Sequence, residues 1–377
     1  MSAGSSTWPL VAPAYGTASL CDLVPSATAV LDGTGPADNV LALPPARRIV
    51  LLLVDGLGQR LLERHAADAP YLSTLSRREL TCGVPSTTAT SLTSLGVGLP
   101  PGAHGVVGYT SRIPGTDRLL NALRWDSSVD AEEWQPHPTA LAAAARAGIA
   151  TTVVTKSGFE GTGLTVASQR GAEFAGADSA GERLAEAVRA AQATPSLVYV
   201  YDADLDATGH REGCRSEAWR HQLATVDAFA QRLREVIPDD AVLLVTADHG
   251  MVDVAEAGRV DVDAEPDLTE GLALLGGEAR FRHLYCRSGA VEDVAQRWRA
   301  RFGDAVLVLT RDEAVQAGWF GPLRREVEPR IGDLVVACVD DVAVLSSHKF
   351  PHEASLVGLH GSLTAEEMYV PLLVDAP

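Results

Sequence analysis

Continuous apolar runs, rather than alternating ones, mark the strands that this chain predicts. The run at 47–55, rich in leucine and β-branched residues, shows no polar face, as expected for a central strand buried on both sides. Three further runs, at 150–155, 196–201 and 240–246, also predict strands. Segments with helical spacing of apolar residues lie between them: 59–67, 140–148, 181–192 and 215–236. This alternation predicts an α/β fold whose mostly parallel sheet is flanked by helices on both faces.

The pattern changes after residue 260. Short predicted strands and helices follow one another there: 280–286, 291–302, 305–309, 313–318 and 333–339. We interpret residues 261–345 as a small α+β cap inserted into a catalytic core formed by residues 1–260 and 346–377. The core is completed by a last strand at 368–374. The first forty residues, rich in Pro, Gly, Ser and Ala, predict an extended arm on the surface.

The composition and net charge of the chain indicate which kinds of binding partner are favoured. The 377-residue chain is 46% hydrophobic and 21% charged, which is typical of a globular protein, and its formal net charge is −18. That charge disfavours a nucleic-acid polymer or an anionic membrane surface. It leaves open a small phosphorylated substrate if bound cations invert the local field.

The cysteines and the lengths of the apolar runs indicate in which cellular compartment the protein is expected. The five cysteines are widely spaced and form no CxxC pair, so the chain predicts neither a disulfide framework nor a thiolate zinc site. The first residues lack the basic-then-apolar pattern of a signal peptide, and no apolar run is long enough to cross a bilayer. We therefore expect a cytoplasmic protein.

A cluster of hydroxyl side chains precedes a Gly/Pro-rich run in residues 82–110. The hydroxyls belong to Ser86, Thr87, Thr88, Thr90 and Ser91, at the start of a helix predicted for 86–95. Such residues most often cap a helix. A helix N-terminus also favours an anion, so one of Thr87 and Thr88 is a candidate nucleophile.

Acids and histidines follow the predicted strands. In a parallel sheet, catalytic and ligand-binding residues commonly lie just past the carboxyl ends of the strands. They are Asp55, Asp206, His210, Asp248, His249 and His360. Each is a weak signal alone, since an Asp after a strand often merely caps the next helix. Together with a threonine hydroxyl they provide oxygen and imidazole ligands for two divalent ions, and this ligand set suits catalytic zinc or manganese.

The ordered set of a strand-end Asp, a Thr cluster, DATGH, DHG and a late GLHG resembles the alkaline phosphatase superfamily. Within it, the chain is similar to the nucleotide pyrophosphatase/phosphodiesterase branch. The resemblance implies one metal held by Asp206, His210 and His360. It implies a second metal held by Asp55, Asp248, His249 and the nucleophile.

The shared segment GLPPGAHG, at residues 98–105, locates the implied nucleophile. Counting back from it gives Thr88, with its neighbour Thr87 as the alternative. The chain departs from the branch just after this segment. Relatives usually have an Asn there that contacts a phosphoryl oxygen, whereas this chain has Tyr109. Tyr109 or Asn121 is the candidate replacement, and Lys156 is a candidate cation for the substrate.

The resemblance implies a phosphodiesterase or nucleotide pyrophosphatase that forms a covalent threonyl-phosphoryl intermediate. The expected substrate is a small phosphorylated molecule such as a nucleotide or another phosphodiester. Two alternatives in the same superfamily are a phosphomonoesterase and a phosphonate hydrolase. A catalytically silent relative that only binds metal is the non-enzyme alternative.

Overall fold

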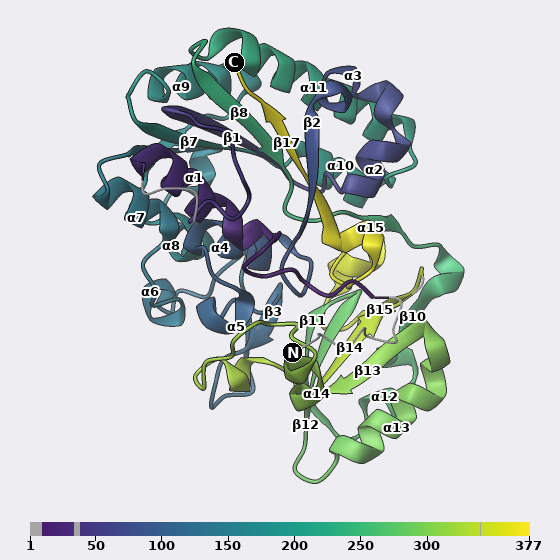
Figure 1. The fold of residues 1–377 in the computed structure, drawn as a ribbon. Helices are drawn as coiled ribbons and strands as arrows, with labels where there is room; N and C mark the ends of the chain where they lie inside the picture. Colours follow the sequence, from purple (N-terminus) through teal and green to yellow (C-terminus); the bar gives the residue numbers. More distant parts are fainter. Residues whose placement is uncertain (1–9, 34–37, 340) are drawn as a thin grey trace.

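A seven-stranded sheet runs through the larger of two lobes in the computed structural model, which describes residues 10–33, 38–339 and 341–377 (Figure 1). Its strands, in spatial order, are β2 (Ser76–Thr81), β17 (Tyr369–Asp375), β8 (Ala241–Thr246), β1 (Arg48–Val54), β7 (Ser196–Asp202), β5 (Ala150–Thr155) and β6 (Glu173–Gly176). β17 runs antiparallel to both of its neighbours, and the other four pairings within this sheet are parallel. The predicted mostly parallel sheet is therefore confirmed.

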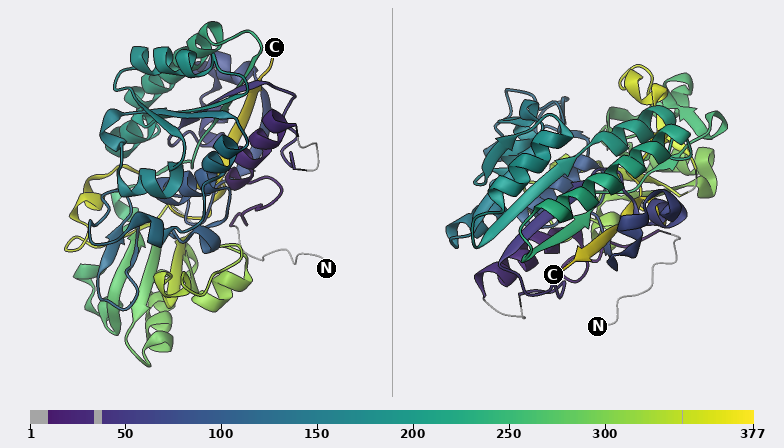
Figure 2. Two further views of the ribbon diagram at one scale, coloured as in Figure 1. Left: turned by 90° about the vertical axis from the view of Figure 1, so that its left-hand side faces the viewer. Right: turned by 90° about the horizontal axis from the view of Figure 1, so that it is seen from above.

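Two groups of helices cover the sheet (Figure 2). One consists of α1 (Leu23–Asp32), α4 (Thr88–Val97), α7 (Ala140–Arg146) and α8 (Gly163–Gln169). The other includes α2 (Gln59–Arg64), α3 (Pro70–Thr74), α9 (Ala180–Ala190) and α11 (Glu217–Val236). The apolar side chains of β1, β7 and β8 are buried between these layers, as their uninterrupted hydrophobic runs predict.

The predicted extended arm is wrong for residues 20–32. A 3-10 turn at Leu20–Asp22 leads directly into α1, and Leu20, Leu23 and Val24 are buried in the main core. Pro25 suggested irregular structure, but it lies in the first turn of α1, where its missing N–H leaves no helical hydrogen bond unmade. Residues 1–9 and 34–37 of the predicted arm lie outside the described residues.

The smaller lobe contains an antiparallel sheet of four strands. Their order is β11 (Leu272–Glu278), β12 (Phe281–Cys286), β14 (Leu334–Cys338) and β13 (Val306–Thr310). One face packs on α13 (Val291–Phe302) through a separate apolar cluster around Trp298. The other face, including Phe281 and Ala337, joins the main core. We propose residues 261–345 as the bounds of this inserted unit, which is packed on both sides.

Candidate metal centre and active site

The candidate ligands gather where strands of the large sheet end. Asp55 directly follows β1, and Asp248 and His249 come two and three residues after β8. Asp206 and His210 lie on α10 (Asp204–Glu212), the helix that begins after β7. His360 comes from the loop after the short strand β16 (Gly358–Leu359). Neighbouring parallel strands end at one edge, which is why residues far apart in sequence meet here.

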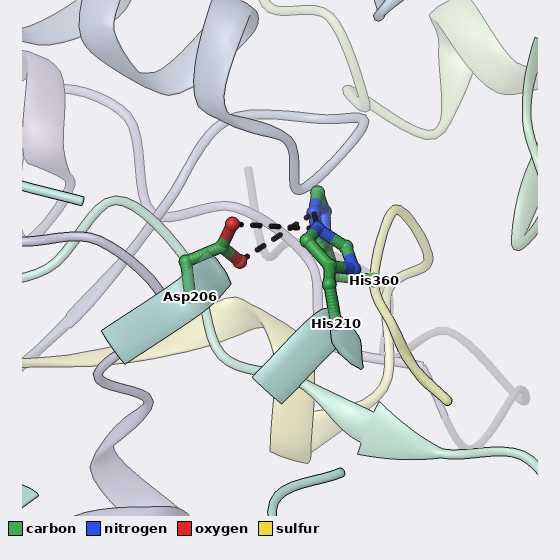
Figure 3. A group of neighbouring side chains, drawn as sticks. All are labelled: Asp206, His210 and His360. Atoms are coloured by element: carbon green, nitrogen blue, oxygen red, sulfur yellow. Dashed lines mark hydrogen bonds and ion pairs between the residues drawn. The ribbon is translucent and has the colours of Figure 1, made fainter. Parts of the chain in front are cut away.

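Asp206, His210 and His360 form one compact group of possible ligands (Figure 3). Their spacing on α10 places Asp206 and His210 on one face of the helix, with Oδ2 of Asp206 3.3 Å from Nε2 of His210. The Nε2 atoms of His210 and His360 are also 3.3 Å apart. The structure therefore brings the first predicted ligand set together.

A second group lies beside the first and contains Asp55, Asp206 and His249. The Nε2 atom of His249 is 3.4 Å from Oδ1 of Asp55 and 3.5 Å from Oδ2 of Asp248. Asp206 thus reaches both groups. Asp248, which the resemblance assigns to this set, contacts the ring of His249 and accepts hydrogen bonds from the backbone N–H groups of Gly56 and His249.

The hydrogen bonds of the three histidines indicate where their lone pairs point. The Nδ1 atoms of His210, His249 and His360 lie 2.8, 3.0 and 2.9 Å from the backbone carbonyl oxygens of Gly358, Gly250 and Ser86. Since a carbonyl only accepts, each Nδ1 must carry the proton, and each Nε2 presents a lone pair to the group.

Buried carboxylate oxygens without a hydrogen-bond partner face the same place. They are Oδ1 of Asp55, Oδ1 of Asp206 and Oδ2 of Asp248. Lone pairs from three imidazoles and three carboxylates repel one another unless cations lie between them. The donor set therefore fits divalent metal ions, with the imidazole orientation fixed by the carbonyl groups behind each ring.

Burial and charge shift the protonation of this cluster. Burial, followed by the charges of Asp248 and Asp206, raises the pKa of Asp55 well above its usual range. Burial, with the neighbouring His249 and His210, lowers the pKa of His360 well below its usual value. The Tyr201 hydroxyl donates a hydrogen bond to Oδ2 of Asp55 and so holds that carboxylate in place.

Thr87 and Thr88 point to different partners. Helix α4 begins at Thr88, two residues later than predicted, and Thr87 is its N-cap residue. The Oγ1 atom of Thr88 lies 3.2 Å from Nε2 of His249. The side chain of Thr87 lies instead beside the carboxyl group of Glu278 in the smaller lobe. Of the two candidate nucleophiles, Thr88 is the one beside the ligand cluster.

Two of the three predicted substrate contacts, Asn121 and Lys156, have side-chain partners of their own. Tyr109 is half-buried, and its carbonyl oxygen accepts a hydrogen bond from the N–H of Ala122, next to Asn121. The side-chain oxygen of Asn121 accepts from the backbone N–H groups of Leu123 and Arg124. Lys156 donates to Oδ1 of Asp204 at 2.8 Å.

Sequence reasoning missed two residues that border the cluster, Tyr201 and Glu278. Tyr201 lies at the carboxyl end of a buried strand, and this position is a signal that could have identified it. Glu278 follows two glycines within the inserted unit. We find no motif in the sequence that links Glu278 to the cluster.

A mostly parallel α/β sheet with acids and imidazoles clustered at its carboxyl edge is an arrangement suited to binding divalent metal ions. A family model described as type I phosphodiesterase/nucleotide pyrophosphatase matches residues 49–363. The chain belongs to this family of phosphoesterases. Comparison with curated protein sequences finds no match.

Solved structures share the fold. Murine ectonucleotide pyrophosphatase/phosphodiesterase 5 superposes with a TM-score of 0.70 at 17% identity, covering 87% of this chain and 88% of that one. An inactive variant of that protein in complex with AMP gives a TM-score of 0.71 at 17% identity, covering 88% of each chain. Phosphonoacetate hydrolase from Sinorhizobium meliloti, in complex with phosphonoacetate, gives 0.64 at 20% identity, covering 88% and 90%.

Among the described residues, no helix combines the length and the apolar character that a membrane-spanning segment needs.

Proposed function

We propose that the protein is a metal-dependent phosphodiesterase or nucleotide pyrophosphatase with Thr88 as its nucleophile. The observation that carries this proposal is the convergence of three imidazole Nε2 atoms and three unpartnered carboxylate oxygens beside the Thr88 hydroxyl. Asp206, His210 and His360 would hold one divalent ion, and Asp55, Asp248 and His249 the other. Asp206 is close enough to serve both.

In the proposed reaction, the hydroxyl oxygen of Thr88 attacks the phosphorus in line. A Thr–O–P bond forms, and the ester bond to the departing alcohol breaks, leaving a threonyl-phosphoryl intermediate. Water then attacks the same phosphorus and frees the hydroxyl. When bound, divalent ions supply positive charge that favours the ionised hydroxyl and the phosphoryl oxygens.

The placement of Thr88 supports this role. It is the first residue of α4, where backbone N–H groups and the helix dipole favour an anion. The inactive variant of the murine relative carries alanine in place of a threonine, which agrees with a threonine nucleophile in the family. We propose Tyr109 as the residue that contacts a phosphoryl oxygen, with Asn121 beside it as the alternative.

The ion pair between Lys156 and Asp204 favours a diester over a monoester. A phosphomonoester dianion carries one charge more than a diester and gains more from a cation in the site. Lys156, the cation that the sequence places at this edge, is already neutralised by Asp204. The substrate we propose is therefore a small phosphodiester, such as a nucleotide ester. A phosphonate is the second candidate, because phosphonoacetate hydrolase shares the fold.

Zinc is the ion we propose, with manganese as the alternative, because the donors are carboxylates and imidazoles without thiolate. The five cysteines are all free, which agrees with the reducing cytoplasm as the proposed location.

A comparison of bis(p-nitrophenyl) phosphate with p-nitrophenyl phosphate tests the proposal. We expect a higher kcat/KM for the diester. We also expect chelation to abolish hydrolysis and added Zn²⁺ or Mn²⁺ to restore it. A faster reaction with the monoester would favour a phosphomonoesterase. A protein that binds metal but hydrolyses neither these esters nor a phosphonate would be the silent relative.

A further inference from the structure

Glu278 brings a carboxyl group from the inserted unit to the candidate active site. It is the last residue of β11, and a two-residue turn connects it to β12. The side chain is buried, and its Oε1 atom has no hydrogen-bond partner. A buried carboxyl group without full partners is costly, so its position requires a physical reason.

The turn that carries Glu278 is fixed to the core by buried contacts. Arg280 forms a two-pronged ion pair with Glu367, with N–O distances of 2.7 and 2.9 Å, and both side chains are fully buried. Glu367 also accepts a hydrogen bond from the N–H of Ser362, in the loop that carries His360. The carbonyl oxygen of Ala279 accepts from the N–H of Val344. Glu278 is thus held on a rigid support rather than on a loose loop.

Glu278 contacts both halves of the site. Its Oε2 atom is 3.7 Å from Nδ1 of His360, the ring atom opposite the candidate metal-binding nitrogen. Its carboxyl group also lies beside Thr87, the residue before the candidate nucleophile. One side chain therefore lies against a candidate metal ligand and against the turn that positions Thr88.

The backbone around this contact is tightly joined. The N–H of Ser86 donates to the carbonyl oxygen of Gly361, and the N–H of Gly361 donates to the Ser86 hydroxyl. Gly361 has a φ of +131°, and a Cβ there would lie 2.7 Å from Cγ of Glu278. Any larger residue at 361 would push the carboxyl group away, so the loop geometry and the position of Glu278 depend on each other.

We propose that Glu278 is a positioning residue that sets the distance between the nucleophile turn and the His360 metal ligand. The inserted unit then takes part in catalysis by orienting these two groups. This inference rests on the proposed function. Outer partners of metal-binding histidines commonly change metal affinity or activity by about 10–100-fold when they are replaced.

The test combines Glu278→Gln with metal binding and kinetics. Zn²⁺ is titrated into the metal-free protein by calorimetry, and the metal-loaded protein is assayed with bis(p-nitrophenyl) phosphate. We expect a roughly 10-fold or greater loss of Zn²⁺ affinity together with a similar fall in kcat. KM should change less than about twofold, because misplacing the nucleophile affects the transition state more than substrate binding.

Glu265→Gln is the matched control. Glu265 pairs with Arg301 on the outer side of the same inserted unit, so this variant should retain the Zn²⁺ affinity and the kcat of the unchanged protein. Unchanged Zn²⁺ affinity and kcat in folded Glu278→Gln overturn the inference and leave the proposed function intact. If the unchanged protein hydrolyses neither bis(p-nitrophenyl) phosphate nor p-nitrophenyl phosphate, the Zn²⁺ affinity measured by calorimetry still decides the role of Glu278.

Glu278→Asp provides a second variant if Glu278→Gln does not fold. It keeps the carboxyl group but withdraws it by one methylene, and the same loss of affinity and kcat is expected. Failure of both variants to fold would make Glu278 a purely structural residue and would overturn the proposal.

Discussion

The hydroxyl oxygen of Thr88 lies 3.2 Å from Nε2 of His249, whereas the side chain of the neighbouring Thr87 lies beside Glu278. Because only Thr88 reaches the ligand cluster directly, we predict that Thr88→Ala lowers kcat with bis(p-nitrophenyl) phosphate by on the order of 10³-fold or more. Steady-state kinetics, with metal content checked in the same samples, measures the effect.

Thr87→Ala is the companion variant. It should retain far more of its hydrolytic rate than Thr88→Ala, because it removes a contact with Glu278 but not the nucleophile. If Thr87→Ala is inactive while Thr88→Ala keeps full activity, the assignment of the two threonines is reversed.

Tyr201 hydrogen-bonds to Asp55, so Tyr201→Phe removes a donor without changing the shape of the side chain. We predict a roughly 10-fold weaker affinity for Zn²⁺, because the carboxylate loses the contact that orients it. Calorimetric titration of the metal-free protein provides the measurement. Tyr199, a buried tyrosine on the same strand whose hydroxyl has no partner, supplies the control Tyr199→Phe. Equal affinities in both variants would show that the Tyr201 hydroxyl does not matter for metal binding.

The ion pair between Lys156 and Asp204 predicts a change in substrate preference. Asp204→Asn leaves Lys156 without its anionic partner, and the free cation should favour substrates with more negative charge. We expect the ratio of kcat/KM for the monoester to that for the diester to rise roughly 3–10-fold. Lys156→Met should not raise this ratio. A ratio that is the same in Asp204→Asn and in the unchanged protein would place Lys156 outside the substrate's reach.

His104 is a buried histidine that is not one of the candidate metal ligands. We predict that it makes the free energy of unfolding depend on pH. Burial lowers its pKa from 6.5 to about 3, and its ring hydrogen-bonds to Ser94 and to the N–H of Val106. Below pH 6.5 the unfolded chain binds a proton that the folded protein does not bind. The free energy of unfolding should therefore fall as the pH drops from 6.5 toward 3, by up to about 1.4 kcal/mol per pH unit from this residue.

Denaturant unfolding of the metal-free protein between pH 4 and 7 measures this slope. His104→Gln should flatten it by about one proton, whatever its effect on stability at neutral pH. The control His221→Gln replaces an exposed histidine on α11 and should leave the slope unchanged. Identical slopes in the two variants would contradict the expectation for His104.

The sequence predicted the parts of the fold whose signal is local. Strand β5 and helix α13 were located at their observed bounds, because an apolar run or a helical period identified each one. Strand β11 was missed, since Gly276 and Gly277 within it suggest a turn. Helix α1 was missed because Pro25 suggests irregular structure although the first turn of a helix tolerates it.

The candidate site also contains residues that the sequence predicted and residues that it did not. The acids and histidines stand at the ends of recognisable strands, and the structure brings all six together at one edge. Glu278 could not be predicted, because its contact with His360 depends on how the inserted unit packs against the core. The partners of Lys156 and Asn121 could not be predicted either. Lys156 contacts Asp204, which is distant in sequence, and Asn121 contacts backbone groups within its own turn.

The position of β17 has a consequence for the synthesis of this protein. This strand is synthesised after the other six strands of its sheet, yet it lies between β2 and β8 rather than at an edge. Until it arrives, both neighbours expose unpaired backbone groups that other chains can join. A nascent or truncated chain without residues 369–375 should therefore aggregate and depend on chaperones, and the order of synthesis makes closure of the sheet a late event in folding.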